Sequence, residues 1–181
     1  MRRLKTSIMG SYIIDIDIYK DDRGFFSEVW NKKKFNLLIN ENINFVQENF
    51  SRSKKNVLRG LHYQIKKPQA KLVSVFSGAV YDVIVDLRVS SPTFKNWFGV
   101  TLSSTNKKLL WIPIGCAHGF YVLSNSADLV YKTTEHYFPK YERCIKWNDK
   151  DLSIKWNINN LPILSSRDSN AINFRDAEYF Q

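Results

Sequence analysis

The chain has 181 residues and carries 27 Lys and Arg against 17 Asp and Glu, which gives a formal net charge of +10. Its 44% hydrophobic and 14% aromatic content is ample for a folded core and argues against a disordered chain. The positive charge favours anionic partners. Because the basic residues are spread along the chain, a phosphorylated small molecule fits them at least as well as nucleic acid.

The N-terminal residues show no signal for secretion or membrane insertion. The stretch MRRLKTSIMGSYIIDID holds two arginines but no uninterrupted apolar run of the kind that a signal peptide needs. No segment approaches the roughly 18 consecutive apolar residues of a membrane span. Cys116 and Cys144 lie far apart and match neither a disulfide framework nor a zinc-binding spacing. We therefore expect a cytoplasmic protein with no membrane partner.

Two elements are expected ahead of residue 45. Residues 11–19, SYIIDIDIY, have strand character but no hairpin partner close by in the sequence. Residues 31–39, NKKKFNLLI, predict a helix with Asn31 as its N-cap and with Phe35, Leu38 and Ile39 on one face.

From residue 45 to residue 138 the sequence alternates between apolar and polar side chains with a period of two, which is typical of β-strands. Strands are predicted at residues 56–64, 71–76, 78–89, 96–103, 109–113, 118–124 and 129–138. Short strands at such regular spacing indicate a sandwich, a jelly roll or a barrel. The tail is expected to add a short helix near residues 149–152 and then to be irregular. No repeat or linker interrupts the chain, so residues 1–181 are expected to form one domain.

Several of these strands carry polar side chains among apolar neighbours, and such groups are costly on an inward face unless they are used or paired. Gln47 and Asn49 share one face of residues 45–51, and Tyr131 shares a face of the last strand with Tyr137. A set of this kind is typical of a wet pocket rather than a filled core.

In the stretch NVLRGLHYQ, residues 56–64, the strand pattern must also account for the faces on which Arg59 and His62 lie. Strict alternation would put Arg59 and His62 on opposite sides of the strand. Gly60 lies between them, and a glycine inside a strand often marks a β-bulge. We expect such a bulge to bring both side chains to one side.

Three kinds of chemistry could use these residues. A metal site usually needs two or three histidines with a carboxylate, but His62 has no second histidine nearby in the sequence, so no metal is expected. Cys116 lies two residues before His118, which is no nucleophile–base geometry by itself and favours a buried thiol. Acid–base chemistry remains, with a histidine base and a tyrosine acid. For His62 or Tyr131 taken alone, a packed core side chain is the alternative.

Six segments resemble signatures of the dTDP-4-dehydrorhamnose 3,5-epimerases, a metal-independent group of cupin-like jelly rolls. They are DDRGFFSEVW, FVQENFSRSKKNVLRGLHYQ, QAKLVSVFSGAVYDVIVDLRVSSPTF, LLWIPIGCAHGFYVLS, VYKTT and LPILSSRD. They cover nearly the whole chain in the family's order, which is far more specific than any one of them. The resemblance implies a mainly β, cupin-like jelly-roll β-barrel with a few short helices, assembled as a homodimer.

The resemblance also implies a role for each site residue. His62 would be the general base, Asp168 would orient it, and Tyr131 would be the general acid on the opposite face of a sugar. Arg23, Arg59 and Lys71 would hold anionic or carbonyl groups, chiefly a diphosphate. The other implied substrate-binding residues are Glu28, Gln47, Asn49, His118, Tyr137, Glu142 and Arg167.

The implied substrate is a nucleotide-diphosphate sugar, dTDP-4-dehydro-6-deoxy-D-glucose, and the implied product is dTDP-4-dehydro-L-rhamnose for rhamnose and polysaccharide biosynthesis. The protons on C3 and C5 are both α to the C4 carbonyl, so removal of either one gives an enolate that basic residues near the C4 oxygen stabilise. Protonation from the other face inverts the carbon. A base and an acid suffice, so neither a cofactor nor a metal is expected.

Three positions depart from the family's usual pattern and keep alternatives open. Arg167 stands where lysine is usual, Cys116 where an aromatic residue is usual, and Glu48 where aspartate is commoner. A 3-epimerase or 5-epimerase of a related deoxysugar is therefore an alternative.

Two alternatives without catalysis also bear on the site. A sugar-nucleotide-binding jelly roll would not need His62, Asp168 and Tyr131 together. A nucleic-acid-binding domain would expose aromatic residues among Lys and Arg, whereas the aromatics here occupy core-like positions, so no nucleic-acid partner is expected.

Overall fold

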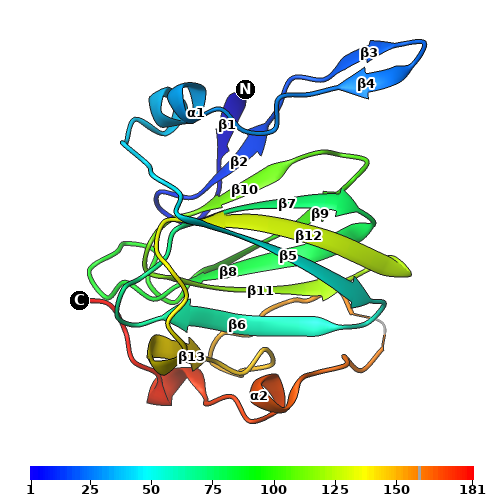
Figure 1. Cartoon of the computed structure of the whole chain (residues 1–181). Coiled ribbons are helices and arrows are strands. Elements are labelled where there is room, and N and C mark those ends of the chain that lie inside the picture. Colours follow the sequence, from blue (N-terminus) through cyan, green and yellow to red (C-terminus); the bar gives the residue numbers. More distant parts are fainter. Residues whose placement is uncertain (159) are drawn as a thin grey trace.

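The computed structural model describes residues 1–158 and 160–181, mainly as two antiparallel β-sheets that face each other (Figure 1). One sheet has six strands in the order β1 (Arg2–Lys5), β2 (Tyr12–Asp15), β10 (Leu109–Ile112), β7 (Lys71–Ser77), β12 (Ser126–Thr133) and β5 (Gln47–Lys54). The other has five, in the order β13 (Glu142–Cys144), β6 (Leu58–Gln64), β11 (Cys116–Val122), β8 (Ala79–Asp86) and β9 (Trp97–Ser103). The predicted mainly β fold is confirmed.

Alternation along β8 explains why both faces of the five-stranded sheet are buried. Val80 and Ile84 pack in the core between the sheets, against apolar residues of β7, β10 and β12. Val83 and Val85 belong to a second core on the opposite face, which Trp156 of the C-terminal segment covers. Burial of one apolar side chain contributes roughly 1.5–3 kcal/mol, so this strand stabilises two layers at once.

The C-terminal segment lies across the outer face of the five-stranded sheet (Figure 1). The prediction of a helix near residues 149–152 is wrong, because the backbone turns there. The buried Asp149 carboxylate accepts hydrogen bonds from the backbone N–H groups of Asp151, Leu152 and Phe174, which holds the turn against the tail. Helix α2 (Ser166–Ser169) and a 3₁₀ turn at Phe174–Asp176 lie further along the tail.

Helix α1 (Lys32–Ile39) forms where the sequence predicts it. Its N-cap is Asn31, whose side-chain oxygen accepts a hydrogen bond from the backbone N–H of Lys34 at 3.1 Å. The buried Phe35 packs edge-on against Trp111 of β10, with ring centroids 5.4 Å apart. No helix in the described residues is long and apolar enough to cross a membrane.

The N-terminal strand is paired within its own chain, so the expectation that it lacks a nearby partner is wrong. β2 pairs with β1 on one side and with β10 on the other. β1 forms the edge of the sheet, and all four of its residues are exposed. The chain then leaves the body as a hairpin of β3 (Tyr19–Asp21) and β4 (Gly24–Phe26), which projects into solvent (Figure 1).

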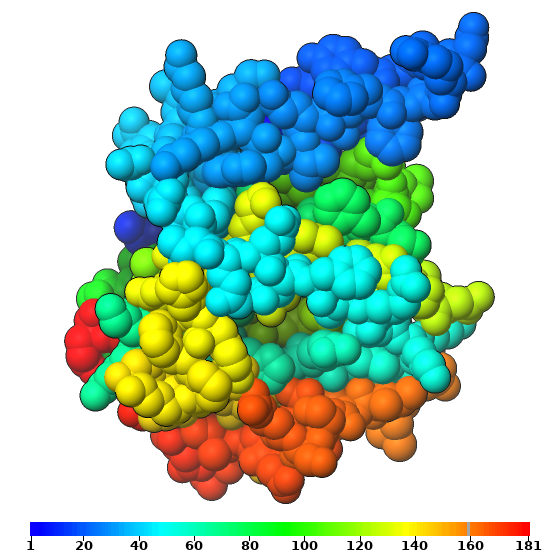
Figure 2. Space-filling view, viewed as in Figure 1, coloured from blue at the N-terminus to red at the C-terminus, as the bar shows by residue number. Residues whose placement is uncertain are grey.

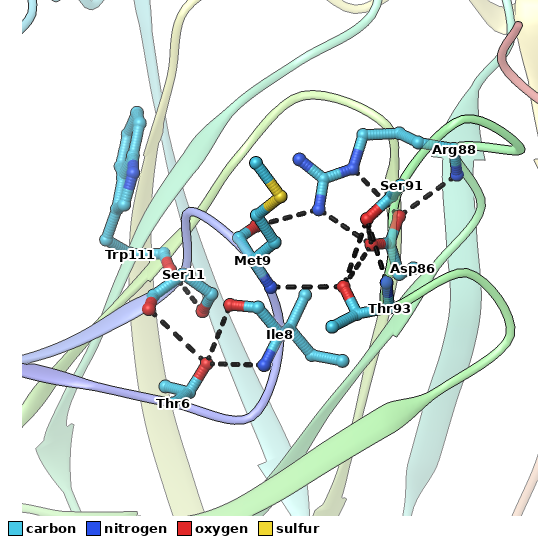
Figure 3. Close-up of polar contacts among 9 residues, drawn as sticks. All are labelled: Thr6, Ile8, Met9, Ser11, Asp86, Arg88, Ser91, Thr93 and Trp111. Atoms are coloured by element: carbon cyan, nitrogen blue, oxygen red, sulfur yellow. Dashed lines mark hydrogen bonds and ion pairs between the residues drawn. The ribbon is translucent and has the colours of Figure 1, made fainter.

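A buried polar network fixes the N-terminal loop to the turn that follows β8 (Figure 3). Both carboxylate oxygens of Asp86 accept hydrogen bonds from Arg88, and Ser91 and Thr93 donate to one of them at 2.6 Å. Burial alone would raise the pKa of Asp86, but these donors outweigh it and lower the pKa. Arg88 and Thr93 also bond the backbone of Met9. This network therefore has a structural role and lies outside the cavity described next.

Candidate active site

A cavity of about 880 Å³ opens between the two sheets on the side of β5 and β6. Figure 2 shows it as a recess framed by the cyan-to-teal residues of these strands, the yellow segment after β12 and the orange C-terminal segment. The predicted site residues that line it are Gln47, Asn49, Arg59, His62, Lys71, His118, Tyr131, Tyr137, Glu142, Arg167 and Asp168. The fold thus brings together residues that lie more than a hundred positions apart.

The irregularity that the sequence predicts at Gly60 is present. The pairing of β6 with β11 shifts register between His118 and Phe120, opposite the Arg59–His62 stretch, and both Arg59 and His62 line the cavity. Gly60 has a φ of +117°, and a Cβ there would lie 2.6 Å from the Cα of Gly119 and from the carbonyl oxygen of His118. A glycine is required because any side chain would collide with the neighbouring strand.

His62 and Asp168 form the most direct pair in the cavity. The Nε2 atom of His62 lies 2.7 Å from Oδ1 of Asp168. The Asp168 side chain is 3% exposed, whereas that of His62 is 27% exposed. Burial would raise the pKa of Asp168, but hydrogen bonds from His62 and Ser165 outweigh it and lower the pKa to about 2. The carboxylate is therefore ionised at neutral pH and holds the imidazole ring in place.

Two residues around Asp168 were missed by the sequence interpretation. The Ser165 hydroxyl donates to Oδ2 of Asp168 at 2.7 Å and caps α2 by accepting from the Asp168 backbone N–H. A serine three residues before an acidic residue is a helix-start signal that could have revealed it. The Cys144 thiol donates to Oδ1 of Asp168 at 3.7 Å. Its place follows from the pairing of β13 with β6, which sets Cys144 opposite His62, and no local pattern shows this.

A second imidazole–carboxylate pair lies beside the first. His118 on β11 is opposite His62 in the strand register, and its Nε2 lies 2.9 Å from Oδ1 of Asp82. Both side chains are almost completely buried. Burial lowers the pKa of His118 even though Asp82 opposes the shift, so this imidazole is neutral. Asp82 was not predicted as a partner, although its position among apolar residues of β8 was a signal.

Lys71 and Tyr131 face the cavity from the six-stranded sheet. The Lys71 Nζ lies 5.8 Å from the centre of the Tyr131 ring. Desolvation lowers the pKa of the buried Lys71 to about 8, although Asp82 and Glu142 oppose the shift. Burial also raises the pKa of Tyr131, which keeps the phenol protonated. These two groups therefore lie on the wall opposite His62, which belongs to the five-stranded sheet.

The rim of the cavity is built from polar and charged groups. Glu142 pairs with Arg167 and accepts a hydrogen bond from the Tyr137 hydroxyl at 2.7 Å. Gln47 bonds Asn49 at 2.8 Å and accepts from the backbone N–H of Tyr137.

Two further polar residues line the cavity, Ser51 on β5 and Arg59 on β6. Arg59 is an exposed residue, anchored to Ser53 at 3.0 Å. The Ser51 hydroxyl is buried in the wall and has no hydrogen-bond partner among residues 1–158 and 160–181.

Three other residues weighed in the sequence lie away from this cavity. Arg23 is in the projecting hairpin, with its side chain 90% exposed and paired with Asp21. Glu28 pairs with Lys34 at 2.7 Å. Cys116 lies in the core between the sheets, where burial raises its thiol pKa to about 12, as expected for an inert buried thiol.

The arrangement suits proton transfer at a carbon atom next to a carbonyl. It offers an imidazole held by a carboxylate on one wall, a protonated phenol on the other, and a buried ammonium beside the phenol.

The chain is similar to proteins of known function over nearly its whole length. The family profile described as dTDP-4-dehydrorhamnose 3,5-epimerase matches residues 5–176. A dTDP-4-dehydrorhamnose 3,5-epimerase of Shigella flexneri is 49% identical over 181 residues, with 99% of each chain covered. One of Pseudomonas aeruginosa is 47% identical over 180 residues, also with 99% of each chain covered.

A solved structure shows the same likeness in three dimensions. It is the dTDP-6-deoxy-D-glucose-3,5-epimerase from Legionella pneumophila Philadelphia 1 in complex with dTDP-4-keto-L-rhamnose. The match has a TM-score of 0.94 at 48% identity and covers 96% of this chain and 93% of that chain. The likeness extends over both sheets, so the cupin-like jelly roll that the sequence predicts is confirmed.

Proposed function

Because the chain belongs to the dTDP-4-dehydrorhamnose 3,5-epimerase family, we propose that it inverts C3 and C5 of dTDP-4-dehydro-6-deoxy-D-glucose, giving dTDP-4-dehydro-L-rhamnose for rhamnose biosynthesis. The observation that carries the proposal is a single cavity in which His62 and Tyr131 come from opposite sheets. An inversion needs this arrangement, because the proton must leave from one face of the sugar and return to the other.

His62 acts as the general base through Nδ1. Its Nε2 faces Asp168 and donates to the carboxylate, which leaves the Nδ1 lone pair available. No residue within 1–158 and 160–181 hydrogen-bonds Nδ1. When Nδ1 takes the proton from C3 or C5, the ring becomes an imidazolium and Asp168 stabilises the new charge. The partly exposed ring then returns this proton to solvent.

Lys71 stabilises the enolate. The electrons of the broken C–H bond move to the C4 oxygen, where a buried ammonium interacts more strongly than it would in water. The resemblance assigns Lys71 chiefly to the diphosphate, but its burial beside Tyr131 favours a position at the reacting carbons. The exposed Arg59 and the rim residue Arg167 are better placed to meet the diphosphate.

Tyr131 acts as the general acid. It gives its phenolic proton to the face of the carbon that points away from His62, and it recovers a proton from solvent before the next round. The second carbon is inverted by the same three steps. Gln47, Asn49, His118, Tyr137 and Glu142 shape the walls that hold the sugar nucleotide.

The protein works in the cytoplasm as one domain in a homodimer and has no nucleic-acid partner. Arg23 and Glu28 are expected to bind substrate, yet the hairpin carries Arg23 away from the cavity of its own chain (Figure 1). The proposed homodimer and the proposed binding of substrate by Arg23 are compatible if the hairpin reaches the cavity of a partner chain. The exposed Tyr19 and Phe26 of this hairpin, whose ring centroids lie 6.5 Å apart, support such a contact, because a contiguous exposed apolar patch often marks an interaction site.

The experiment that tests the function follows hydrogen exchange at each carbon. The purified chain is incubated with dTDP-4-dehydro-6-deoxy-D-glucose in deuterated water, and C3 and C5 are monitored by NMR. Deuterium at both carbons with formation of the L-sugar supports the proposal. Deuterium at one carbon identifies a 3-epimerase or a 5-epimerase instead, and no exchange at either carbon overturns an epimerase function.

A further inference from the structure

Three potential metal ligands, one of them the imidazole of His62, meet on the side of this ring that faces Asp168. The imidazole of His62, the thiol of Cys144 and the carboxylate of Asp168 each offer one ligand atom, and these atoms all lie within 4.8 Å of one another. Strand pairing sets Cys144 opposite His62, and α2 supplies Asp168. Asp168 Oδ1 lies 2.7 Å from His62 Nε2 and 3.7 Å from Cys144 Sγ. The cluster therefore consists of one nitrogen, one sulfur and one oxygen donor.

We propose that His62, Cys144 and Asp168 form a binding site for zinc, and that zinc bound there switches the enzyme off. Zinc accepts imidazole, thiolate and carboxylate ligands, and three protein ligands with one open position are a common zinc arrangement. A hard cation such as magnesium prefers oxygen ligands and water, so this mixed donor set discriminates against it.

The spacing of the three ligand atoms must change before they can hold the metal. In a tetrahedral zinc site with bond lengths of 2.0–2.3 Å, the ligand atoms lie roughly 3.3–3.6 Å apart. The sulfur–oxygen distance of 3.7 Å already fits. The nitrogen–oxygen distance of 2.7 Å is that of a hydrogen bond, and the nitrogen–sulfur distance is up to 4.8 Å. The imidazole must therefore move away from the carboxylate by roughly 0.6 Å and toward the sulfur by roughly 1 Å. His62 has room to do so, because it lines the main cavity.

The cluster is reachable from two sides. His62 and Asp168 line the main cavity, and Cys144 lines a second cavity of about 410 Å³. Glu142, Ser166 and Arg167 belong to both linings, so the cluster lies at the boundary between the two cavities. A water molecule from either side can complete the coordination. Glu142 and Asp168 add negative charge there, and Arg167 is paired with Glu142.

Metal binding would disable the base through the tautomer of His62. Zinc on Nε2 displaces the hydrogen bond to Asp168, so the ring proton moves to Nδ1, and the Cys144 thiol releases its proton to solvent. Nδ1 is the atom that must take the proton from the sugar, and in the metal-bound form it carries a hydrogen and has no free lone pair. This consequence rests on the proposed role of His62, whereas the metal site itself does not.

Metal binding is best measured without substrate, because the diphosphate of the substrate also binds cations. The full chain is titrated with cobalt(II), which replaces zinc and gives a near-ultraviolet charge-transfer band when a thiolate binds it. The matched variants are Cys144→Ala, Cys144→Ser and Cys116→Ala. We expect the band in the wild type and in Cys116→Ala, its displacement by zinc, and its absence in both Cys144 variants. Since changes around a metal ligand cost about 10–100-fold in affinity, loss of the ligand itself should cost at least about 100-fold.

The inhibition is measured by titrating zinc into the epimerase assay, with each variant normalised to its own rate without metal. Zinc should inhibit the wild type, a chelator should restore it, and the Cys144 variants should need at least about 100-fold more zinc. Equal inhibition of the wild type and the Cys144 variants would mean that the metal acts on the substrate or elsewhere, and would overturn the proposal. So would a missing cobalt band. A cobalt band in a protein without epimerase activity would refute the proposed function and leave the metal site standing.

Discussion

At the scale of single residues, the protein contains two imidazole–carboxylate pairs that differ in their access to solvent. His62 with Asp168 and His118 with Asp82 have nearly the same spacing, 2.7 and 2.9 Å, and the two histidines face each other across paired strands. His118 is almost completely buried and its ring is held by Asp82, so it has no direct route for exchanging a proton with water. His62 is partly exposed and can release a proton to water after each cycle. Solvent access therefore favours His62 over His118 as the proposed base.

Replacement of His62 by asparagine should abolish exchange of both sugar protons, because the other imidazole of the cavity, His118, is almost completely buried and held by Asp82. We expect the rate to fall by about 10²–10⁴-fold or more, the range of a positioned general base. NMR in deuterated water measures the loss at C3 and C5. The matched control is His136→Asn, which changes an exposed histidine outside the cavity. Near-normal exchange in His62→Asn would show that His62 is not the base.

Replacement of Tyr131 by phenylalanine should slow inversion without abolishing proton exchange, unlike replacement of His62. The base remains, so the sugar proton is still removed, and deuterium still enters from the His62 face. Inversion should slow by about 10²–10⁴-fold, because the proton donor on the opposite face is gone. The ratio of exchange to inversion is the measurement, with Tyr141→Phe as the control outside the cavity. Exchange and inversion that fall together would argue against separate roles for the two residues.

The lowered pKa of Lys71 predicts that activity declines at alkaline pH. Desolvation lowers its pKa to about 8, so Lys71 is charged below that pH and neutral above it. If the ammonium stabilises the enolate, kcat should decline as the pH rises through about 8. Lys71→Met should lower kcat by about 10²–10³-fold, as for loss of one oxyanion donor, and should no longer show this decline. A wild-type kcat that stays level well above pH 8 would exclude the charged lysine from the rate-limiting step.

At the scale of elements, β6 contributes side chains both to the hydrophobic core and to the cavity. Its Leu58 and Leu61 pack in the outer core, while Arg59 and His62 face the cavity. A regular strand would place Arg59 and His62 on opposite faces, since side chains alternate. The register shift opposite Gly60 resolves this conflict, and it requires a residue with positive φ and no Cβ. The active site thus depends on one glycine in the backbone.

Gly60→Ala should therefore damage both stability and activity. The new Cβ would lie 2.6 Å from the backbone of β11, and φ would remain strained at +117°. We expect a loss of at least about 2 kcal/mol in the free energy of unfolding, together with a large loss of kcat. Gly24→Ala is the matched control, because Gly24 also has a positive φ but nothing lies within 4 Å of its Cβ position. Urea denaturation of both variants separates the collision from the strain, and equal losses would contradict the argument.

Local sequence patterns predicted the positions of the helices and strands better than the pairing between strands. Period-two alternation found most strands of both sheets but not the short β1 and β13. Asn31 marked the start of α1, because such signals are carried by neighbouring residues. The contact of Asp168 with Cys144 depends on pairing between β13 and β6 and on the fold of the tail. The pairing of β2 with β10 was missed for the same reason: these strands are almost a hundred residues apart, and nothing in either one specifies the other.

At the scale of the whole molecule, the hairpin of β3 and β4 is the feature that one chain does not explain. It extends away from both sheets, and its Tyr19, Phe25 and Phe26 are exposed (Figure 1). Arg23 lies at its tip between these aromatics and far from the cavity lining of its own chain. Light scattering of the wild type should give about twice the 21.3 kDa of a single chain if the proposed homodimer forms.

The decisive test of a shared site is complementation between two defective chains. Arg23→Ala should lower kcat/KM by about 10–100-fold, because a charge-assisted hydrogen bond to the diphosphate contributes about 1.5–3 kcal/mol. His62→Asn is inactive for the reason given above. The two variants are co-expressed with different tags, and the mixed dimer is purified by both tags. If each hairpin serves the partner's cavity, the mixed dimer has one site with both defects and one intact site. Symmetry then predicts about half of the wild-type activity. If each hairpin serves its own cavity, neither site is intact, and the mixed dimer should show only about half of the residual activity of the Arg23→Ala parent.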